Sequence, residues 1–338
     1  MIIVLKPDIS KKDELAVLKE IKKLGYKPHV MRGVERTVIG AIGDERKNHT
    51  LETLTAVFPQ VERVMPVQKR YKLTSREAHK GNSTINVRGN IIGGKKVQIM
   101  AGPCSVEDEK QLLTTAHAVK KAGATILRGG AFKPRTSPYE FQGLGEKGLK
   151  LLAKARKETG LAIITELLSE QHAELVAEYA DILQIGARNC QNFQLLIAAA
   201  KTGKPVLLKR GLSMKIEEWL LAGEYVLAND NANLMFCERG IRTFETYTRN
   251  TLDLSTVPII KKESHCPIVI DPSQGAGRSD LVSAMCKGAI AMGADALLVE
   301  VHPNPAEAWS DGAQQVTLEG FAKLMEELKP FISAVGRE

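Results

Sequence analysis

The chain has 338 residues, 43% of them hydrophobic and 25% charged, and a formal net charge of +8. A chain of this size can bury a large core, and it has room for one large domain and a smaller one. Its basic residues are interleaved with acidic ones, as in Lys11-Lys12-Asp13-Glu14, and no basic tract or row of aromatic residues accompanies them, so the charge does not indicate a nucleic-acid partner.

The sequence also argues against a membrane protein and against a secreted one. No apolar run approaches the roughly 20 residues of a membrane span, and Met1 to Leu5 lacks the basic start and long apolar region of a secretory signal. The five cysteines are scattered and odd in number, which favours reduced thiols over a disulfide scaffold. We therefore expect a cytoplasmic protein with no membrane partner.

Residues 1 to 67 predict a small domain with the order βαββαβ, which is that of a ferredoxin-like fold. Its expected elements are a strand at Ile2–Leu5, a helix capped by Asp8 or Ser10 and ending at Leu24, strands at Pro28–Met31 and Thr37–Ile42, a short helix at Thr50–Phe58 and a strand at Val61–Val67. The domain has no phosphate-binding loop and no paired carboxylates. We interpret it as a regulatory or oligomerisation domain, and a domain that only helps subunits to pack stays open as the alternative.

Residues 68 to 84 are polar and lack periodicity, so we expect a linker there. Residues 85 to 338 are expected to form the large domain, which begins with a hairpin. Its two arms are Ile85–Val87 and Ile91–Ile92, separated by Arg88-Gly89-Asn90. The hairpin is expected to close one end of the large domain.

From Val97 onward, short apolar segments alternate with helical ones. The predicted strands are Val97–Met100, Thr125–Leu127, Ala162–Thr165, Ile182–Ile185, Val206–Leu208, Asn233–Cys237, Ile268–Ile270 and Ala296–Val301. The predicted helices are Glu107–Lys121, Glu146–Thr159, Glu170–Tyr179, Phe193–Lys201, Ile216–Leu227, Ser255–Lys262, Leu281–Met292 and Leu318–Val335. Eight such repeats predict an α/β fold, a (β/α)8 TIM barrel. A doubly wound open sheet is the alternative, but no Gly-x-Gly-x-x-Gly follows the first strand.

Cations follow four of the eight predicted strands, each beside a glycine or another small residue. They are Arg128, Lys133, Arg135, Arg188, Lys209 and Arg239. In a barrel the carboxyl ends of the strands meet at one rim, so these side chains are expected to converge. Gathering them at a barrel mouth that is partly shielded from water costs on the order of several kcal/mol per ion unless anions are supplied. The pattern therefore predicts a ligand with several negative charges.

The loop from Ile126 to Gly145 contributes three of those cations and has the composition of an anion-binding loop. Its paired glycines let the backbone approach a ligand, and Thr136 and Ser137 add directional hydrogen-bond donors. This loop predicts that the ligand is a phosphorylated small molecule.

Three potential metal ligands share the same rim: Cys104, Glu300 and Asp311. A lone cysteine is most often a small buried apolar residue, but in this company it makes a metal site credible. We interpret Glu166 as a structural ion-pair partner of a neighbouring cation. His302, which follows a strand-end carboxylate, is either a ligand or a support for one.

Seven segments carry a resemblance to a known family: AGPCSVE, LRGGAFKPRTSPYEFQGLG, QIGARN, LLKRG, CERGIRTF, DPS and VEVHPNPAEAWSDG. Over nearly its whole length the chain resembles the 3-deoxy-D-arabino-heptulosonate 7-phosphate (DAHP) synthases, which are related to the ketodeoxyoctonate phosphate synthases. The KPRTS segment favours the seven-carbon enzyme, because the octulosonate relatives carry an Asn-containing loop there.

The resemblance implies a transferase that condenses phosphoenolpyruvate with erythrose 4-phosphate and water and releases phosphate, at the entrance to the shikimate pathway. The positions that match phosphoenolpyruvate binding are Arg128, Lys133, Arg188, Lys209 and Arg239. The loop that receives the aldose phosphate matches Arg135, Thr136 and Ser137. Ala187 and Asp271 complete the expected substrate-binding set. Lys133 is expected to act as a proton donor or an electrostatic stabiliser.

The family's metal set is Cys, His, Glu and Asp, and this chain matches it at Cys104, Glu300 and Asp311 but carries Gln274 where the family has His. An amide oxygen is a weaker donor to transition metals than imidazole. A divalent metal of the Mn, Zn, Fe or Co class is expected, either weakly bound or dispensable. Three outcomes stay open: a weaker metal enzyme, an enzyme without tightly bound metal, or an inactive relative that acts as a sensor of phosphorylated metabolites.

The resemblance also implies feedback inhibition through the N-terminal domain, by an aromatic amino acid such as Tyr or Phe. Deleting residues 1 to 66 is then expected to leave the condensation running and to remove the inhibition. Relatives are commonly tetrameric, so a homotetramer is expected.

Overall fold

The structure is a computed structural model that describes residues 1–338 except 8, 33–36, 44–50, 52, 66–68 and 80. It divides into two compact units, Met1–Arg70 and Tyr71–Glu338. Several predicted positions lie outside the described residues: the Asp8 cap, the start of the short helix at Thr50, the end of the small domain at residue 67 and the start of the linker at residue 68.

The first unit is a four-stranded antiparallel sheet with the strand order β2-β3-β1-β4. Its elements are β1 (Ile2–Leu5), α1 (Lys11–Lys23), β2 (Lys27–Arg32), β3 (Thr37–Ile42), α3 (Leu54–Val57) and β4 (Val61–Met65). Ser10 caps α1, because its side chain accepts a hydrogen bond from the backbone N–H of Asp13. Val17 and Ile21 of α1 pack against Ile3 and Ile39 of the sheet, which makes the unit's own core. The order and pairing are those of a ferredoxin-like fold.

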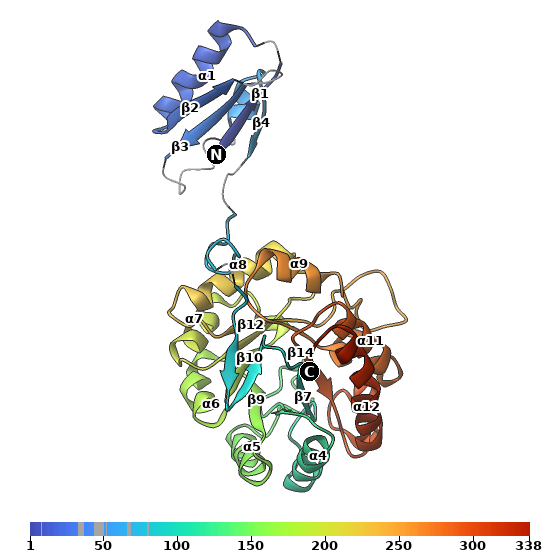
Figure 1. Cartoon of the computed structure of the whole chain (residues 1–338). Coiled ribbons are helices and arrows are strands. Elements are labelled where there is room, and N and C mark those ends of the chain that lie inside the picture. The colour runs from blue at the N-terminus through green and yellow to red at the C-terminus, as the bar shows by residue number, and fades with distance from the viewer. Residues whose placement is uncertain (8, 33–36, 44–50, 52, 66–68, 80) are drawn as a thin grey trace. The chain divides into compact units, whose positions relative to one another are not determined.

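The second unit is a closed barrel of eight parallel strands (Figure 1). The strands are β7 (Gln98–Gly102), β8 (Ile126–Arg128), β9 (Ala162–Glu166), β10 (Ile182–Ile185), β11 (Val206–Lys209), β12 (Leu234–Glu238), β13 (Ile268–Ile270) and β14 (Ala296–Glu300). The barrel closes where β14 pairs with β7. The predicted TIM barrel is confirmed, and the open sheet is excluded.

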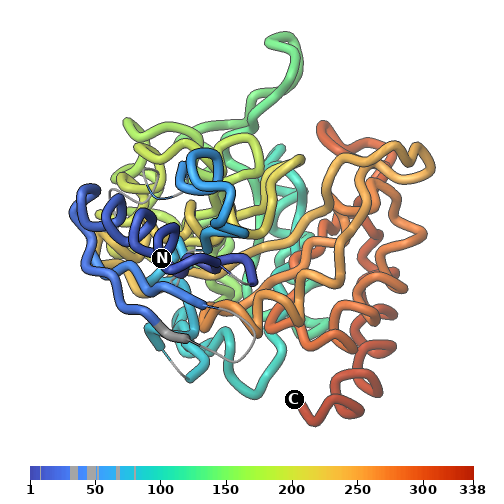
Figure 2. The backbone as a smooth tube through the Cα atoms, turned by 90° about the horizontal axis from the view of Figure 1, so that it is seen from above, coloured from blue at the N-terminus to red at the C-terminus, as the bar shows by residue number. Residues whose placement is uncertain are grey.

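Helices surround the barrel (Figure 1). They are α4 (Glu109–Lys121), α5 (Glu146–Thr159), α6 (Ala173–Tyr179), α7 (Phe193–Lys201), α8 (Ile216–Leu227), α9 (Thr256–Glu263), α11 (Ser279–Ala291) and α12 (Leu318–Ala334). A further helix, α10 (Pro272–Ala276), directly follows β13. The short helix α10 was not predicted. It forms because Asp271 caps it and Pro272 stands at its first position, where a missing N–H costs nothing. Figure 2 shows α12 alongside α11, and it shows the loop between β8 and α5 extending away from the barrel.

The barrel has an inner and an outer core because parallel strands are buried on both faces. Along β10, Leu183 belongs to the cluster that packs against the helices, and Ile182 belongs to the cluster inside the barrel. The hairpin of β5 (Ile85–Val87) and β6 (Asn90–Ile92) adds apolar side chains to the inner cluster. It thereby covers the amino-terminal end of the barrel, opposite the end at which the strands finish.

The segment assigned to a linker is packed on the second unit from Tyr71 onward. The Tyr71 hydroxyl donates to Glu263 at 2.7 Å, and the Thr74 hydroxyl donates to Glu224 at 2.7 Å. Its polar side chains find partners on α8 and α9, which polarity and missing periodicity alone did not predict.

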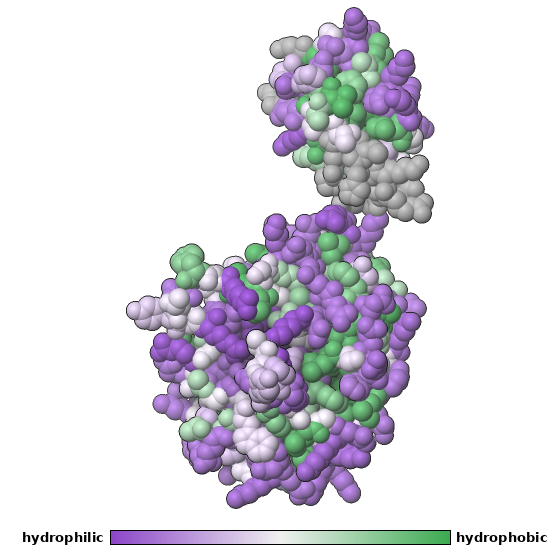
Figure 3. All heavy atoms as spheres, turned by 180° about the vertical axis from the view of Figure 1, so that it is seen from behind, coloured by the Kyte–Doolittle hydropathy of each residue, from purple (hydrophilic) through white to green (hydrophobic). Residues whose placement is uncertain are grey.

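None of the described helices has both the length and the apolar character needed to cross a membrane. Figure 3 shows one face of the molecule, on which hydrophilic side chains are spread over both units and apolar ones form separate patches.

Candidate active site

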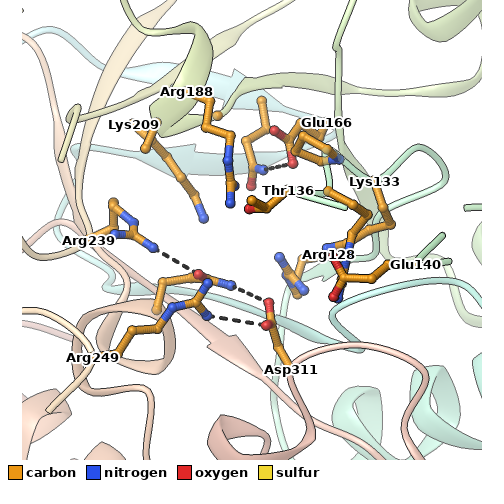
Figure 4. Close-up of a pocket in the computed structure, with 16 residues that line it drawn as sticks. Arg128, Lys133, Thr136, Glu140, Glu166, Arg188, Lys209, Arg239, Arg249 and Asp311 are labelled. Carbon is orange, nitrogen blue, oxygen red and sulfur yellow. Dashed lines mark hydrogen bonds and ion pairs between the residues drawn. The ribbon is translucent and has the colours of Figure 1, made fainter. Parts of the chain in front are cut away.

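A polar cavity of about 220 Å³ lies at the carboxyl ends of the barrel strands (Figure 4). Its lining consists of Arg128, Lys133, Pro134, Arg135, Thr136, Glu140, Glu166, Gln184, Gly186, Ala187, Arg188, Lys209, Arg239, Arg249, Gln274 and Asp311. These residues come from β8 to β12, from the loops that follow them, from α10 and from the loop after β14. The barrel therefore gathers at one mouth groups that are up to 183 positions apart in the chain.

The structure brings together the five cations predicted to bind phosphoenolpyruvate. Four of them are buried, with exposed fractions of 5% for Arg128, 8% for Lys133, 4% for Lys209 and 5% for Arg239. The fifth, Arg188, is exposed at the edge of the cavity. Four buried cations thus lie at the deep end of the mouth, and one further cation stands at its entrance.

Three of the buried cations contact carboxylates, backbone carbonyls or the Cys104 sulfur, and the fourth, Arg239, contacts the Gln274 amide. Lys209 Nζ contacts Asp271 Oδ2 at 2.6 Å, and both side chains are almost fully buried. Arg128 Nη1 contacts Glu300 Oε1 at 3.2 Å and donates to the carbonyl of Pro103 at 2.7 Å. Lys133 Nζ donates to the carbonyl of Cys104 at 3.1 Å and to its sulfur at 3.0 Å. These contacts hold the cations in place without using all their donors.

Two buried N–H groups in the mouth lack any partner among the described residues: Arg128 Nε and Arg239 Nη1. A buried donor without an acceptor costs about 1–3 kcal/mol, so folded proteins rarely keep one without a reason. Burial also lowers the pKa of Arg239, and the nearby carboxylates of Asp271 and Glu238 do not fully offset it. Arg128 and Arg239 both line the cavity and both keep unused donors, so its deep end fits an anion.

The loop residues predicted to receive a second phosphate lie further out. Arg135 and Thr136 line the cavity, and Arg135 Nη2 contacts Glu140 Oε1 at 2.6 Å. Ser137 is not among the lining residues; its backbone N–H donates to Glu140 at 3.3 Å. Ala187 does line the cavity. Asp271 does not, and it acts on the cavity through Lys209.

The three predicted metal ligands lie together. One ligand atom each of Cys104, Glu300 and Asp311 lies within 4.8 Å of the others. Burial, and then the charge of Glu300, raises the pKa of the Cys104 thiol to about 11. Burial also works against ionisation of Asp311, but Arg249 and Lys133 outweigh it and lower the pKa of that carboxyl to about 2. The set offers one soft and two hard donors, which fits a divalent transition-metal ion.

Gln274, the residue that departs from the family pattern, contacts both Arg239 and two members of this set, Glu300 and Asp311. Its Nε2 donates to Glu300 Oε1 at 2.9 Å and to Asp311 Oδ2 at 3.3 Å. Its Oε1 accepts from Arg239 Nη2 at 2.9 Å. The amide therefore turns its NH2 group, and not its oxygen, toward the two carboxylates.

Buried polar contacts hold the loop after β14 against the loop after β7. Glu107 Oε2 contacts His302 Nε2 at 3.2 Å, and the hydroxyls of Ser105 and Ser310 are 2.7 Å apart. His302 Nδ1 accepts from the backbone of Asn304, so Nε2 carries the hydrogen that faces Glu107. Of the two roles open to His302, the structure favours support: it positions the loop that carries Asp311.

Some lining residues were missed by sequence reasoning or given another role. Arg249 Nη1 contacts Asp311 Oδ1 at 3.2 Å and Gln314 Oε1 at 3.0 Å. It comes from a loop without periodicity, so no signal marked it. Glu166, interpreted as structural, lines the cavity and accepts from Gln184 at 3.3 Å. Its position at the end of β9 was the signal that could have identified it.

Fold and site define a (β/α)8 barrel protein whose mouth is built to hold small anions beside a potential metal site. The family model described as DAHP synthetase I family matches residues 72–334, and the model described as DAHP synthase ferredoxin-like domain matches residues 1–69. The chain belongs to the DAHP synthetase I family, and the resemblance inferred from its motifs is confirmed.

Relatives of known sequence and structure agree with this assignment. The chain is 51% identical over 336 residues to phospho-2-dehydro-3-deoxyheptonate aldolase of Thermotoga maritima, covering 99% of each. It is 33% identical over 258 residues to 2-dehydro-3-deoxyphosphooctonate aldolase of Caulobacter vibrioides, covering 70% of this chain and 88% of the relative. The crystal structure of the Thermotoga maritima protein matches with a TM-score of 0.89 at 50% identity, covering 100% of this chain and 98% of that one.

A truncated form of the Thermotoga maritima synthase also matches, with a TM-score of 0.75 at 50% identity. It covers 79% of this chain and 98% of its own.

Proposed function

We propose that this chain catalyses the condensation of phosphoenolpyruvate with erythrose 4-phosphate and water to DAHP and inorganic phosphate. In this reaction C3 of phosphoenolpyruvate forms a bond to the aldehyde carbon, water adds at C2, and the C2–O bond to phosphate breaks. One observation carries the proposal: four buried cations share the barrel mouth, and two of them keep buried N–H groups without an acceptor among the described residues. Membership of the DAHP synthetase I family supports phosphoenolpyruvate as this anion.

The depth of the cations in the cavity supports a separate position for each of the two substrates. Arg128, Lys209 and Arg239 lie deep and are suited to the phosphate and carboxylate of phosphoenolpyruvate, together with Lys133 and Arg188. The loop of Arg135, Thr136 and Ser137 lies further out and is suited to the aldose phosphate. Holding both substrates in one cavity replaces a bimolecular encounter by a local one, which accounts for much of the rate gain in such reactions.

Lys133 is suited to act on the reacting atoms. Burial alone lowers the pKa of its ammonium, but the nearby Cys104, Glu300 and Glu166 outweigh burial and raise it. The side chain therefore keeps its proton at neutral pH. It can donate that proton to the aldehyde oxygen, or its positive charge can stabilise the negative charge that develops on that oxygen.

Cys104, Glu300 and Asp311 would hold a divalent ion of the Mn, Zn, Fe or Co class, with the amide oxygen of Gln274 as a fourth ligand. Such an ion supplies Lewis-acid polarisation of the aldehyde oxygen. The donor set fits it, but Gln274 has to turn its oxygen toward the site, because the NH2 group faces Glu300 and Asp311. Weak metal binding follows from this requirement.

A second function, a sensor that binds phosphorylated metabolites without turnover, is favoured by one observation. The Gln274 NH2 group hydrogen-bonds two of the three metal ligands. Phosphate release after mixing both substrates, with chelator and with added Mn²⁺, separates the two functions. Release that requires both substrates supports the synthase. Absence of release under every metal condition, with phosphoenolpyruvate binding retained, supports the sensor.

We further propose that the unit Met1–Arg70 binds Tyr or Phe and inhibits the reaction in a homotetramer. Support comes from the unit's own core, from its match to the ferredoxin-like domain model and from its lack of catalytic groups in the sequence. We assign the reaction to the cytoplasm, since all five cysteines are free thiols. Loss of amino-acid inhibition on removal of this unit tests the regulatory role.

A further inference from the structure

We propose that Gln274 couples the binding of a divalent cation to the binding of phosphoenolpyruvate, so that each ligand strengthens the other. The inference rests on the proposed function, because it takes phosphoenolpyruvate as the anion that contacts Arg239. It concerns a side-chain amide that can face Arg239 with its oxygen or with its NH2 group, but not with both.

The amide has only one satisfied orientation in the structure as it stands. Gln274 Oε1 accepts from Arg239 Nη2 at 2.9 Å, while Nε2 donates to Glu300 and Asp311. Turning the amide over would direct Nε2 at the Arg239 guanidinium, a donor against a donor, and would direct Oε1 at two carboxylates. Without ligands, the amide is therefore held with its NH2 group toward the metal ligands.

The rest of the residue is fixed, so only the side-chain amide can respond. The backbone N–H of Gln274 donates to Asp271 Oδ1 at 2.9 Å, and its carbonyl accepts from Asn250 at 2.9 Å. Its NH2 group is also not essential for the two carboxylates. Glu300 keeps Arg128 and Gln314 as donors, and Asp311 keeps Arg249.

A cation that takes Oε1 as a ligand removes the acceptor of Arg239. The Nη2 group would then join Nη1, which already has no partner among the described residues, in a side chain that is 5% exposed. A buried guanidinium with two unsatisfied donors is strongly unfavourable. Binding a cation is therefore unfavourable because it leaves the Arg239 guanidinium without acceptors.

Phosphoenolpyruvate offsets that cost, because its phosphate and carboxylate oxygens offer acceptors to the Arg239 guanidinium, which lines the cavity. With the anion bound, the amide oxygen is free to turn toward the cation. Linkage requires the reverse effect as well: a bound cation that has taken Oε1 leaves Arg239 better prepared for the anion. Couplings between two sites typically change each affinity about 5–150-fold, and we expect about 10-fold here.

The test measures cation binding by a signal that does not depend on turnover. Co²⁺ is titrated into the full-length protein, and the absorbance of the bond between cobalt and the Cys104 thiolate is followed with and without saturating phosphoenolpyruvate. Two variants separate the effect of the Gln274 amide from the direct attraction between the bound cation and the bound anion. Gln274→Met keeps a similar shape but has no amide, so it reports only the direct attraction between bound cation and anion. Gln274→Glu has two equivalent oxygens, one for Arg239 and one for the cation.

In the unmodified protein, phosphoenolpyruvate is expected to raise the Co²⁺ affinity about 10-fold more than it does in Gln274→Met. Gln274→Glu is expected to bind Co²⁺ more tightly than the unmodified protein when no phosphoenolpyruvate is present, and to show the smaller coupling of Gln274→Met. Equal coupling in the unmodified protein and in Gln274→Met, or no coupling in the unmodified protein, overturns the inference.

Calorimetry of phosphoenolpyruvate binding without metal distinguishes this failure from failure of the proposed function. Binding without an effect on Co²⁺ affinity rejects only the role of Gln274. Absence of binding rejects both.

Discussion

Arg239 and Lys209 are both buried cations of the same cavity, yet replacing them is expected to change stability in opposite ways. Lys209 has a carboxylate partner at 2.6 Å, Asp271, which is fully buried. Arg239 has one hydrogen bond to a neutral amide and an N–H group with no partner among the described residues. The variants Lys209→Met and Arg239→Met remove one charge each and keep an unbranched side chain.

The change in stability that each variant causes depends on the groups that remain after the substitution. Lys209→Met leaves the Asp271 carboxylate buried without its cation, and breaking such a pair costs about 3–5 kcal/mol. Arg239→Met removes a burial penalty of several kcal/mol for the ion and loses a hydrogen bond to Gln274 of about 1.5–3 kcal/mol. The second change is therefore neutral to stabilising by about 1–2 kcal/mol. The two variants should differ by at least about 3 kcal/mol in their free energy of unfolding.

Urea unfolding of the ligand-free proteins measures this difference, and calorimetry measures their affinity for phosphoenolpyruvate. Both variants should lose about 10-fold or more in that affinity, since each lost charged hydrogen bond is worth about 1.5–3 kcal/mol. The double variant Lys209→Met/Asp271→Asn serves as the control. It removes both charges and retains an oxygen for the Gln274 N–H, so it should recover most of the lost stability.

A result in which Arg239→Met unfolds as easily as Lys209→Met would refute this reasoning. It would mean that Arg239 is stabilised by the folded protein itself and does not require an anion.

Three further predictions concern other parts of the chain. A Cβ atom on Gly186 would stand 2.0 Å from Glu166 Oε1, so Gly186→Ala should displace Glu166 and cost about 1–3 kcal/mol of stability. An unchanged KM for both substrates in this variant would show that Glu166 does not matter for substrate binding. All five cysteines are buried, and burial raises the pKa of each thiol. A thiol reagent at about pH 8 should therefore modify none of them in the native protein and all five after unfolding, and rapid modification of the native protein would contradict this. The unit Tyr71–Glu338 alone should retain turnover and lose inhibition by Tyr or Phe, and persistent inhibition would place the effector site in the barrel.

The barrel could be predicted from sequence because each strand is a short apolar run with a distinct end. Ile182–Ile185 and Ile268–Ile270 have the bounds expected for them, and the other strands differ by a few residues at their ends. Strand alternation also separates the neighbours Lys209 and Arg210. Lys209 faces the cavity, while Arg210 contacts Glu238 at 3.0 Å. Residues on regular strands were therefore within reach of sequence reasoning.

The remaining features depend on tertiary contacts that no local pattern encodes. Arg249 reaches the cavity from a long loop, and only the fold brings it to Asp311. The helix α10 has five residues, too few for periodicity, so its local signals are the cap at Asp271 and Pro272 at its first position. The orientation of the Gln274 amide is set by Arg239, 35 positions earlier. Sequence identified Gln274 as unusual, but it could not show which end of the amide faces the carboxylates.

The central claim is that the cations gather at the barrel mouth to hold two phosphorylated metabolites side by side. The most direct test mixes the full-length protein with phosphoenolpyruvate, erythrose 4-phosphate and Mn²⁺, and follows the mixture by phosphorus NMR after the metal has been removed with chelator. Both substrate signals should decline together, while inorganic phosphate and one new phosphate monoester appear in equal amounts. Spectra that stay unchanged, or phosphate that forms from phosphoenolpyruvate without a new monoester, would contradict the account.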